Sequence, residues 1–149
     1  MNTGPLLPET SDQSARERHS VTAIRKEMLL LSGHYSAQCI GETQGLAASD
    51  AEHYVQTARL DGKIFGVRVA GEWRYPAFQF EPQCDFLAVI PEMTAVITAL
   101  VPDEQGWDQL HWFLTPHEIL GGKRPLEVWA EDKNAVVKAA EAERWNGRD

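Results

Sequence analysis

Apolar side chains recur at helical spacing near the start of the chain. They occupy positions i, i+3, i+7 and i+10 between Ser20 and Leu31, and these positions are Val21, Ile24, Met28 and Leu31. Charged residues occupy another face, so the pattern predicts an amphipathic helix. Ser20 is suited to cap this helix and Gly33 to end it.

Two short helices are predicted next, separated by a glycine-containing turn. The first spans Ser36–Gly45, has Ser36 as its N-cap, and packs through Ala37, Cys39 and Ile40. The second begins at Ser49, because Ser-Asp-Ala-Glu is a capping-box pattern. Its predicted buried stripe is Tyr54, Val55 and Ala58. Two short helices joined in this way resemble a helix-turn-helix.

The period changes from helical to alternating after Gly62. Apolar residues at 67, 69, 73 and 75 alternate with charged ones, and Ala70-Gly71 lies between the two runs. This pattern predicts a β-hairpin, whose second strand ends at Pro76 because proline cannot donate to a central ladder. A hairpin directly after a helix-turn-helix is the plan of a winged helix.

The second half of the chain is predicted to be helical. An apolar stripe over residues 84–101 predicts a helix that starts near Pro91, since proline costs about 3 kcal/mol inside a helix. A further helix starts at Trp107 and ends before Pro116. Gly121-Gly122 and Pro125 then form a shaped turn, and a closing helix contains residues 135–140.

Charge restricts where a nucleic acid could bind. The 149-residue chain has a formal net charge of −8, with 10 acidic and 8 basic residues in 1–83 against 12 and 6 in 84–149. Phosphate contacts depend on clustered Lys and Arg, so a DNA surface is expected in the first half. The candidate DNA-binding residues are His53, Gln56, Arg59, Lys63, Arg68 and Arg74. Acidic residues Asp50 and Glu52 on the second short helix oppose this function.

The sequence contains no motif for metal binding or for nucleophilic catalysis. The five histidines lack metal-ligand spacing, the two cysteines match no CxxC box, and no nucleophile elbow is present. We therefore predict a non-enzymatic protein without catalytic residues, metal or cofactor. No secretion signal and no apolar run of about 18 residues is present, so a soluble cytoplasmic protein without membrane contact is expected.

Tryptophans mark a predicted protein-binding surface. Trp107 and Trp129 are expected in the core, whereas Trp112 lies off the main stripe of its helix and Trp145 lies in a polar tail. The candidate partner-binding residues are Trp112, Lys123, Arg124, Arg144 and Trp145.

The last third of the chain resembles a known family. Its motif is Trp107…Trp112-Phe113…Pro116…Leu120-Gly121-Gly122-Lys123-Arg124-Pro125-Leu126-Glu127…Ala135-Val136-Val137-Lys138-Ala139-Ala140. This motif resembles the C-terminal toxin-binding domain of the Xre/MbcA/ParS-type antitoxins. Residues 62–67 with 74–80 look like the wing of small bacterial proteins that place a MerR-like helix-turn-helix before that domain.

The resemblance implies a bacterial regulator with two binding functions. It implies DNA binding through the first half, a partner toxin of the RES type for the second half, and a homodimer, with residues 135–149 approaching the toxin's active site.

We predict an α+β, mostly helical protein in three parts. Residues 1–19 are a disordered lead-in, residues 20–82 form a winged-helix-like module, and residues 84–149 form a small helical module. The leading hypothesis is an antitoxin-like regulator of transcription. The alternative is an acidic interaction module or inhibitor that binds a protein without contacting DNA.

Overall fold

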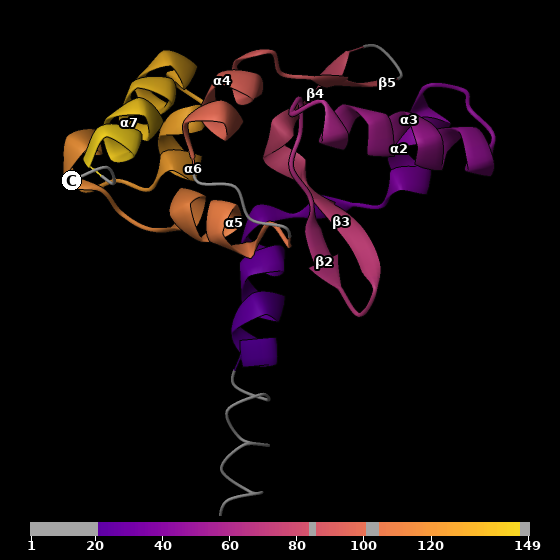
Figure 1. Ribbon diagram of the computed structural model, residues 1–149, viewed down its shortest axis with the longest axis horizontal. Helices are drawn as coiled ribbons and strands as arrows, with labels where there is room; N and C mark the ends of the chain where they lie inside the picture. The colour runs from indigo at the N-terminus through magenta and orange to yellow at the C-terminus, as the bar shows by residue number, and fades with distance from the viewer. Residues whose placement is uncertain (1–20, 84–85, 101–104, 147–149) are drawn as a thin grey trace, which may run out of the picture.

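The computed structural model describes residues 21–83, 86–100 and 105–146, and the side chains up to Arg144 (Figure 1). The predicted disordered lead-in, residues 1–19, lies outside these ranges. The described chain is a mixed α+β protein with small antiparallel sheets, as predicted.

The first half has the winged-helix order of elements. A helix over residues 21–32 is followed by strand β1 (His34–Tyr35), helices α2 (Ala37–Thr43) and α3 (Ala48–Leu60), and strands β2 (Val67–Val69) and β3 (Glu72–Pro76). The three antiparallel strands have the order β1-β3-β2, so β1 completes the sheet of the β2–β3 hairpin. The hairpin and the end of β3 at Pro76 confirm the prediction. Ala70 and Gly71 both have positive φ, as the tight turn requires.

The helix-turn-helix is closely packed, but its predicted caps are only partly right. The Ser36 hydroxyl accepts a bond from the Cys39 N–H, as predicted for an N-cap. The capping box was wrong: α3 starts one residue before Ser49, and Ala47 is its N-cap. A side chain at Gly41 would overlap Ala51, which shows how closely α2 and α3 approach.

Burial on these two helices also differs from the prediction. Ala37, Ile40 and Val55 are buried as expected, but Cys39 is exposed and Tyr54 is 41% exposed. Tyr54 directly precedes the buried Val55 and is turned about 100° from it around the helix axis, so it points to the side of α3 rather than into the core.

A second pair of strands, which was not predicted, precedes the helix expected to start near Pro91. Strands β4 (Phe80–Gln83) and β5 (Phe86–Val89) pair antiparallel, after a 3₁₀ turn, η1, at Ala77–Gln79. The N–H of Leu87 donates to Thr43 Oγ1, and its carbonyl accepts from Gln44 Nε2. Helix α2 therefore satisfies the free edge of β5. Helix α4 (Glu92–Ala99) starts directly after Pro91, as predicted.

Helices also form the described chain from Trp107 onward. They are α5 (Trp107–Leu114), the 3₁₀ turn η2 (Glu118–Leu120), α6 (Pro125–Trp129) and α7 (Lys133–Asn146). Gly121 and Gly122 have φ of 69° and 82°, so the turn predicted from the glycine pair is present. Helix α6, which Pro125 opens at its first position, was not predicted.

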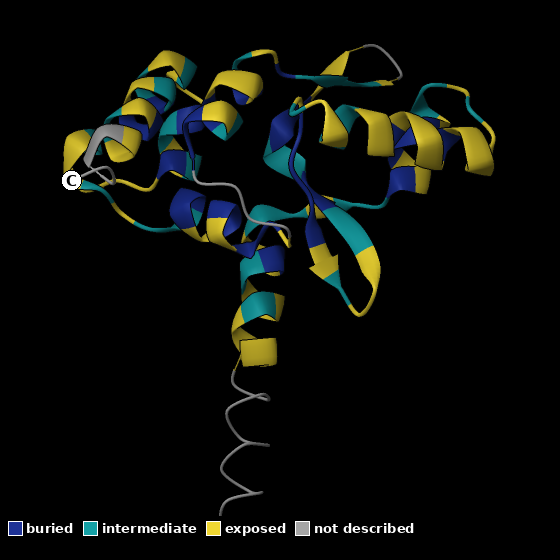
Figure 2. Ribbon diagram, viewed as in Figure 1, coloured by how far each residue is buried: buried dark blue, intermediate teal, exposed yellow. Residues whose placement is uncertain are grey.

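Two hydrophobic clusters form the core (Figure 2). The smaller one lies between α2, α3 and the sheet, and contains Ile40, Val55 and Tyr75. The larger one holds the helices α4 to α7, but it also contains Leu29, Phe65 and Val67 from the first half. The two halves thus share the larger core, and the predicted boundary near residue 83 does not separate two independent cores.

Candidate nucleic-acid interface

Two arginines converge on one tryptophan at the middle pair of the β2–β3 hairpin. The guanidinium carbon of Arg59, on α3, lies 4.0 Å from the ring centroid of Trp73, on β3. The guanidinium carbon of Arg68, which faces Trp73 across the hairpin, lies 5.6 Å from the same centroid. These are cation–π distances, so the half-buried indole holds two positive charges close together.

Arg59 retains unused bonding capacity in this position. Its Nε is buried and has no hydrogen-bond partner among the described residues. Burial raises the pKa of the neighbouring Tyr75 hydroxyl, and the Arg59 charge opposes that shift. Tyr75 is therefore neutral at physiological pH and does not neutralise the arginine.

A basic groove continues from Arg68 to the helix over residues 21–32. It has a volume of about 500 Å³, and its walls carry Arg25, Lys26 and Arg68. None of its described lining side chains is acidic. Its apolar lining is Leu29, Val69 and Trp107. The groove can therefore accept an anionic group between three cations.

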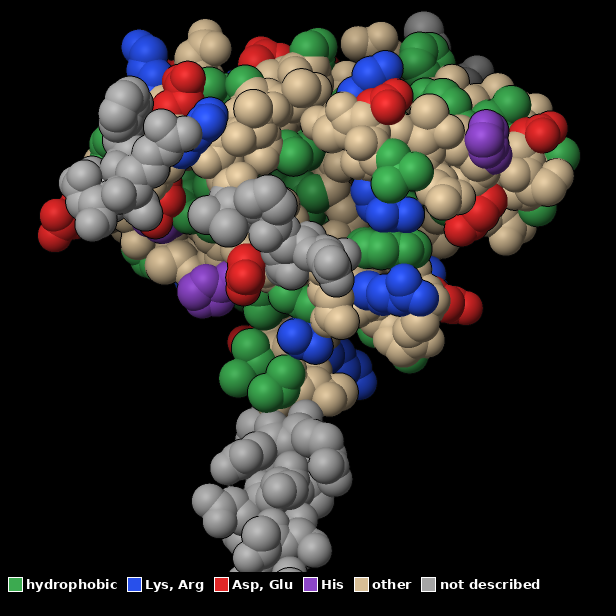
Figure 3. Space-filling model, in the orientation of Figure 1, with side chains coloured by type: hydrophobic (Ala, Val, Ile, Leu, Met, Phe, Trp, Pro, Cys, Tyr) green, Lys and Arg blue, Asp and Glu red, His purple; other side chains and the backbone are tan. Residues whose placement is uncertain are grey.

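Backbone bonds fix the position of Arg68 in this groove. Its N–H donates to the Gln105 carbonyl at 3.0 Å, and its carbonyl accepts from Trp107 Nε1 at 3.1 Å. Arg25 lies over the same tryptophan, with its guanidinium carbon 4.9 Å from the ring centroid. We call Arg25, Lys26, Arg59 and Arg68, with Trp73, the basic band. Figure 3 shows Lys and Arg side chains gathered over the hairpin and the adjoining helix.

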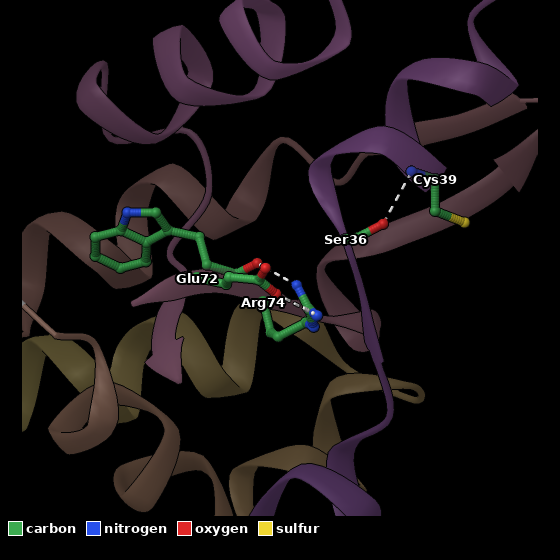
Figure 4. A network of polar contacts seen from close by, with 5 residues as sticks. Ser36, Cys39, Glu72 and Arg74 are labelled. Carbon is green, nitrogen blue, oxygen red and sulfur yellow. Dashed lines mark hydrogen bonds and ion pairs between the residues drawn. The ribbon is translucent and has the colours of Figure 1, made fainter. Parts of the chain in front are cut away.

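Arg74, which was predicted to contact DNA, has its charge neutralised. Its Nη2 lies 2.9 Å from Glu72 Oε2, and its Nη1 donates to the Trp73 carbonyl (Figure 4). It lines a hollow of about 430 Å³ together with Glu52 and the N-cap Ser36. The paired carboxylate makes Arg74 a weaker phosphate ligand than Arg59 or Arg68.

The remaining predicted DNA-binding residues lie on other surfaces of α3 and its following loop. His53 and Lys63 line a hollow of about 640 Å³ between α3 and β5, together with Asp50, Asp61 and Phe86. Gln56 is exposed on α3. The structure therefore brings together Arg59 and Arg68, but it does not bring all six predicted residues onto one surface.

Trp112, a predicted partner-binding residue, is buried within its own chain. It is only 8% exposed, stands edge-on to Phe113, and contacts the His117 ring at 5.0 Å between centroids. Helix α5 is covered on several sides, so a residue off its main stripe is still buried. Trp107 and Trp129 are buried as predicted.

The other predicted partner-binding residues are accessible where the structure describes them. Lys123, Arg124 and Arg144 are exposed, and Arg124 Nε lies 3.9 Å from Glu127 Oε1. The side chain of Trp145 lies outside the described residues.

Three members of the basic band were missed in the sequence. Arg25 and Lys26 were interpreted only as the polar face of a helix, and Trp73 only as a strand residue. The alternation of Arg68 with apolar residues, opposite Trp73, was the available signal for the cation–π pair. Nothing local indicates that Arg25 faces the hairpin, because long-range packing of Leu29 places that helix.

The described residues contain neither a group of metal ligands nor a membrane-spanning helix. No three His, Cys, Asp or Glu side chains there are grouped to hold a metal ion. None of the helices in the described ranges has the length and apolar character needed to cross a bilayer.

The fold and the site define an α+β protein whose first half is winged-helix-like and carries a basic band. Comparison of the chain with protein-family models, curated proteins and solved structures found no match. The resemblance to the Xre/MbcA/ParS-type antitoxins therefore stays a prediction.

Proposed function

We propose that the protein is a DNA-binding regulator of the winged-helix type, which contacts the phosphate backbone through its basic band. The observation that carries the proposal is the convergence of Arg59 and Arg68 on Trp73, continuous with the groove of Arg25 and Lys26. A chain with a net charge of −8 gathers four cations here, beside a hairpin that can follow a groove of the duplex.

The hairpin, rather than α3, is the centre of the proposed contact. The described side of α3 that faces β5 carries Asp50, with Asp61 just beyond the helix, and carboxylates repel phosphates. Base reading by His53 would also require the duplex to enter the hollow between α3 and β5. Binding is thus expected to depend strongly on salt and weakly on sequence.

The test is an Arg59→Ala/Arg68→Ala double variant in a DNA-binding titration at several salt concentrations. We expect at least about 10-fold weaker binding to duplex DNA, and a log–log salt slope shallower by about two, because each cation releases about one counterion. The assay is fluorescence anisotropy with labelled duplexes, including DNA that flanks the protein's own gene.

A charge-matched control separates the band from net charge. Lys123→Ala/Lys138→Ala removes two exposed cations from the second half and should leave both affinity and slope unchanged. The DNA proposal fails if the unmodified protein shows no salt-sensitive binding, or if both double variants lose the same affinity.

For the second half, we propose a protein partner, with a RES-type toxin as the class that the family resemblance implies. The exposed cations Lys123, Arg124 and Arg144 support a surface for an acidic region of that partner. Lys123→Glu/Arg124→Glu should lower co-purification with the product of the neighbouring gene by about 10-fold or more, since like charges would then face each other. Retention of the partner by this variant would exclude this surface.

A second candidate function is binding of a protein through the hollow between α3 and β5. Tyr54 and Phe86 are 41% and 37% exposed there, beside Asp50 and Asp61. Exposed aromatic residues next to carboxylates suit a basic peptide segment. This alternative predicts no gel shift with DNA, whereas the leading proposal requires one.

A further inference from the structure

The basic groove has an apolar floor that a contact with a DNA phosphate does not use. Leu29 and Trp107 line it and are 8% and 6% exposed, because both belong to the larger core. Val69, half-buried on β2, packs against the same core and completes the floor. Covering such apolar surface stabilises a complex in proportion to the area removed from water. The DNA proposal accounts for the cations of the groove but not for this floor.

Three elements hold the groove in its shape. They are the helix over residues 21–32, strand β2 and helix α5. Trp107 Nε1 of α5 donates to the Arg68 carbonyl of β2 at 3.1 Å, and the Arg25 guanidinium lies over the Trp107 ring. The volume of about 500 Å³ falls within the range of about 300–1,000 Å³ that small-molecule sites occupy. The groove is therefore formed before any ligand enters it.

The charge of the groove determines the charge of its occupant. Arg25, Lys26 and Arg68 stand on its walls, and no described lining side chain is a carboxylate. None of these three cations forms an ion pair with another described residue. An anion between them gains charge-assisted hydrogen bonds, and the planar arginine forks match the geometry of a carboxylate or a phosphate.

We propose that the basic groove binds a small organic anion, whose carboxylate or phosphate group lies between the three cations and whose apolar body covers the floor. A bare inorganic anion would leave the floor exposed to water, and a neutral apolar molecule would leave the cations without a partner. Only a ligand with both parts uses the whole groove.

The same cations belong to the basic band, so the anion would compete with DNA. This consequence rests on the proposed function. An organic anion in the groove takes the place of a backbone phosphate and lowers the affinity for the duplex, and by linkage DNA lowers the affinity for the anion by the same factor. The groove is then the effector site of the regulator.

An NMR titration of the isotope-labelled full chain, without DNA, tests the site. The probe is 2-naphthoate, which carries one carboxylate on an apolar double ring. We expect a dissociation constant below about 1 mM, which ordinary ligand efficiency gives for a ligand of this size, and the largest shifts at the Arg68 and Val69 amides and the Trp107 indole N–H. Inorganic phosphate lacks the apolar body and 2-naphthylmethanol lacks the charge, so each should bind at least about 10-fold more weakly.

Lys26→Glu reverses one charge of the groove without touching its floor, because Lys26 is exposed. It should weaken 2-naphthoate at least about 10-fold, since two carboxylates then face each other. Lys138→Glu is the matched control, which makes the same change at an exposed position on α7, outside the groove lining, and should leave the affinity unchanged. Absence of 2-naphthoate binding, shifts centred elsewhere, equal binding of phosphate or 2-naphthylmethanol, or equal losses in the two variants would overturn the site.

A second titration measures the effect on DNA. At constant ionic strength, saturating 2-naphthoate should weaken duplex binding at least about 10-fold, whereas 2-naphthylmethanol at the same concentration should not. If 2-naphthoate binds in the groove and leaves the DNA affinity unchanged, the effector role is wrong although the DNA proposal stands. If the chain binds 2-naphthoate but no DNA, the proposed function fails and the groove remains a site for organic anions.

Discussion

Phe113→Ala is expected to lower the free energy of unfolding by about 3–5 kcal/mol, as for other buried phenylalanines. Phe113 is fully buried on α5, and four aromatic side chains surround its ring. The ring centroids of Phe78, Trp112, Phe65 and Trp129 lie 4.6, 5.2, 6.0 and 6.1 Å from that of Phe113. These partners come from four different segments, so they cannot all move inward to fill the space.

The same variant tests whether the two halves unfold together. Phe65 and Phe78 belong to the first half, whereas Phe113 and Trp129 belong to the second. Urea denaturation followed by tryptophan fluorescence and by far-ultraviolet circular dichroism should therefore give one shared, shifted transition.

Ile119→Ala is the control for Phe113→Ala. Ile119 is exposed, so its truncation should change stability by less than about 0.5 kcal/mol. Two separate transitions in Phe113→Ala, with the first half unaffected, would contradict a shared core.

Local patterns predicted those elements whose causes are local. The β2–β3 hairpin follows from strict alternation around Ala70-Gly71, and the start of α4 follows from the fixed φ of Pro91. The turn before α6 follows from Gly121-Gly122. In each of these places, the residues that specify the geometry are neighbours in the sequence.

Elements that depend on distant partners could not be predicted in this way. A short apolar run such as Phe86–Val89 fits a strand or a helix equally well by periodicity. As a strand it pairs with β4 on one edge, and on its other edge Leu87 bonds to Thr43 and Gln44, which lie 44 and 43 residues earlier. The apolar stripe at residues 21–31 is a similar case, since periodicity gives the apolar face but not the core that it meets, and Val21, Ile24 and Leu31 are exposed.

In the candidate site too, some residues could be predicted from the local sequence, and others depend on packing between distant segments. Arg59 and Arg68 were predicted from local charge excess, and the structure places both beside Trp73. The contribution of Arg25 and Lys26 depends on packing of their helix against Trp107, which is far away in the sequence. The pairing of Arg74 with Glu72 was overlooked, although two residues of one strand share a face and can pair.

Gln79→Leu is expected to destabilise the protein by about 2–5 kcal/mol, because it leaves buried backbone groups without partners. Gln79 is fully buried, which is rare for glutamine. Its Oε1 accepts from the Phe65 N–H at 2.6 Å, and its Nε2 donates to the carbonyls of Phe65 and Pro76 at 2.8 and 3.1 Å. The side chain thus joins the segment before β2 to the end of β3. Leucine has a similar volume but can make none of these bonds.

The measurement for Gln79 is urea unfolding, with Gln83→Leu as the matched control. Gln83 is exposed on β4, so the same substitution there should change stability by less than about 0.5 kcal/mol.

Q79E adds a test of the geometry. A carboxylate at this position would lose the amide donor and face two carbonyls, which raises the pKa of the carboxyl group in the folded state. An acid with a raised folded pKa destabilises the fold increasingly as pH rises through its unfolded pKa, about 4.3 for glutamate. Below that pH, the free energy of unfolding of Q79E should therefore be closest to that of the unmodified protein. If Q79E loses the same free energy of unfolding at pH 4 and at pH 7, the amide donor of Gln79 does not face these carbonyls.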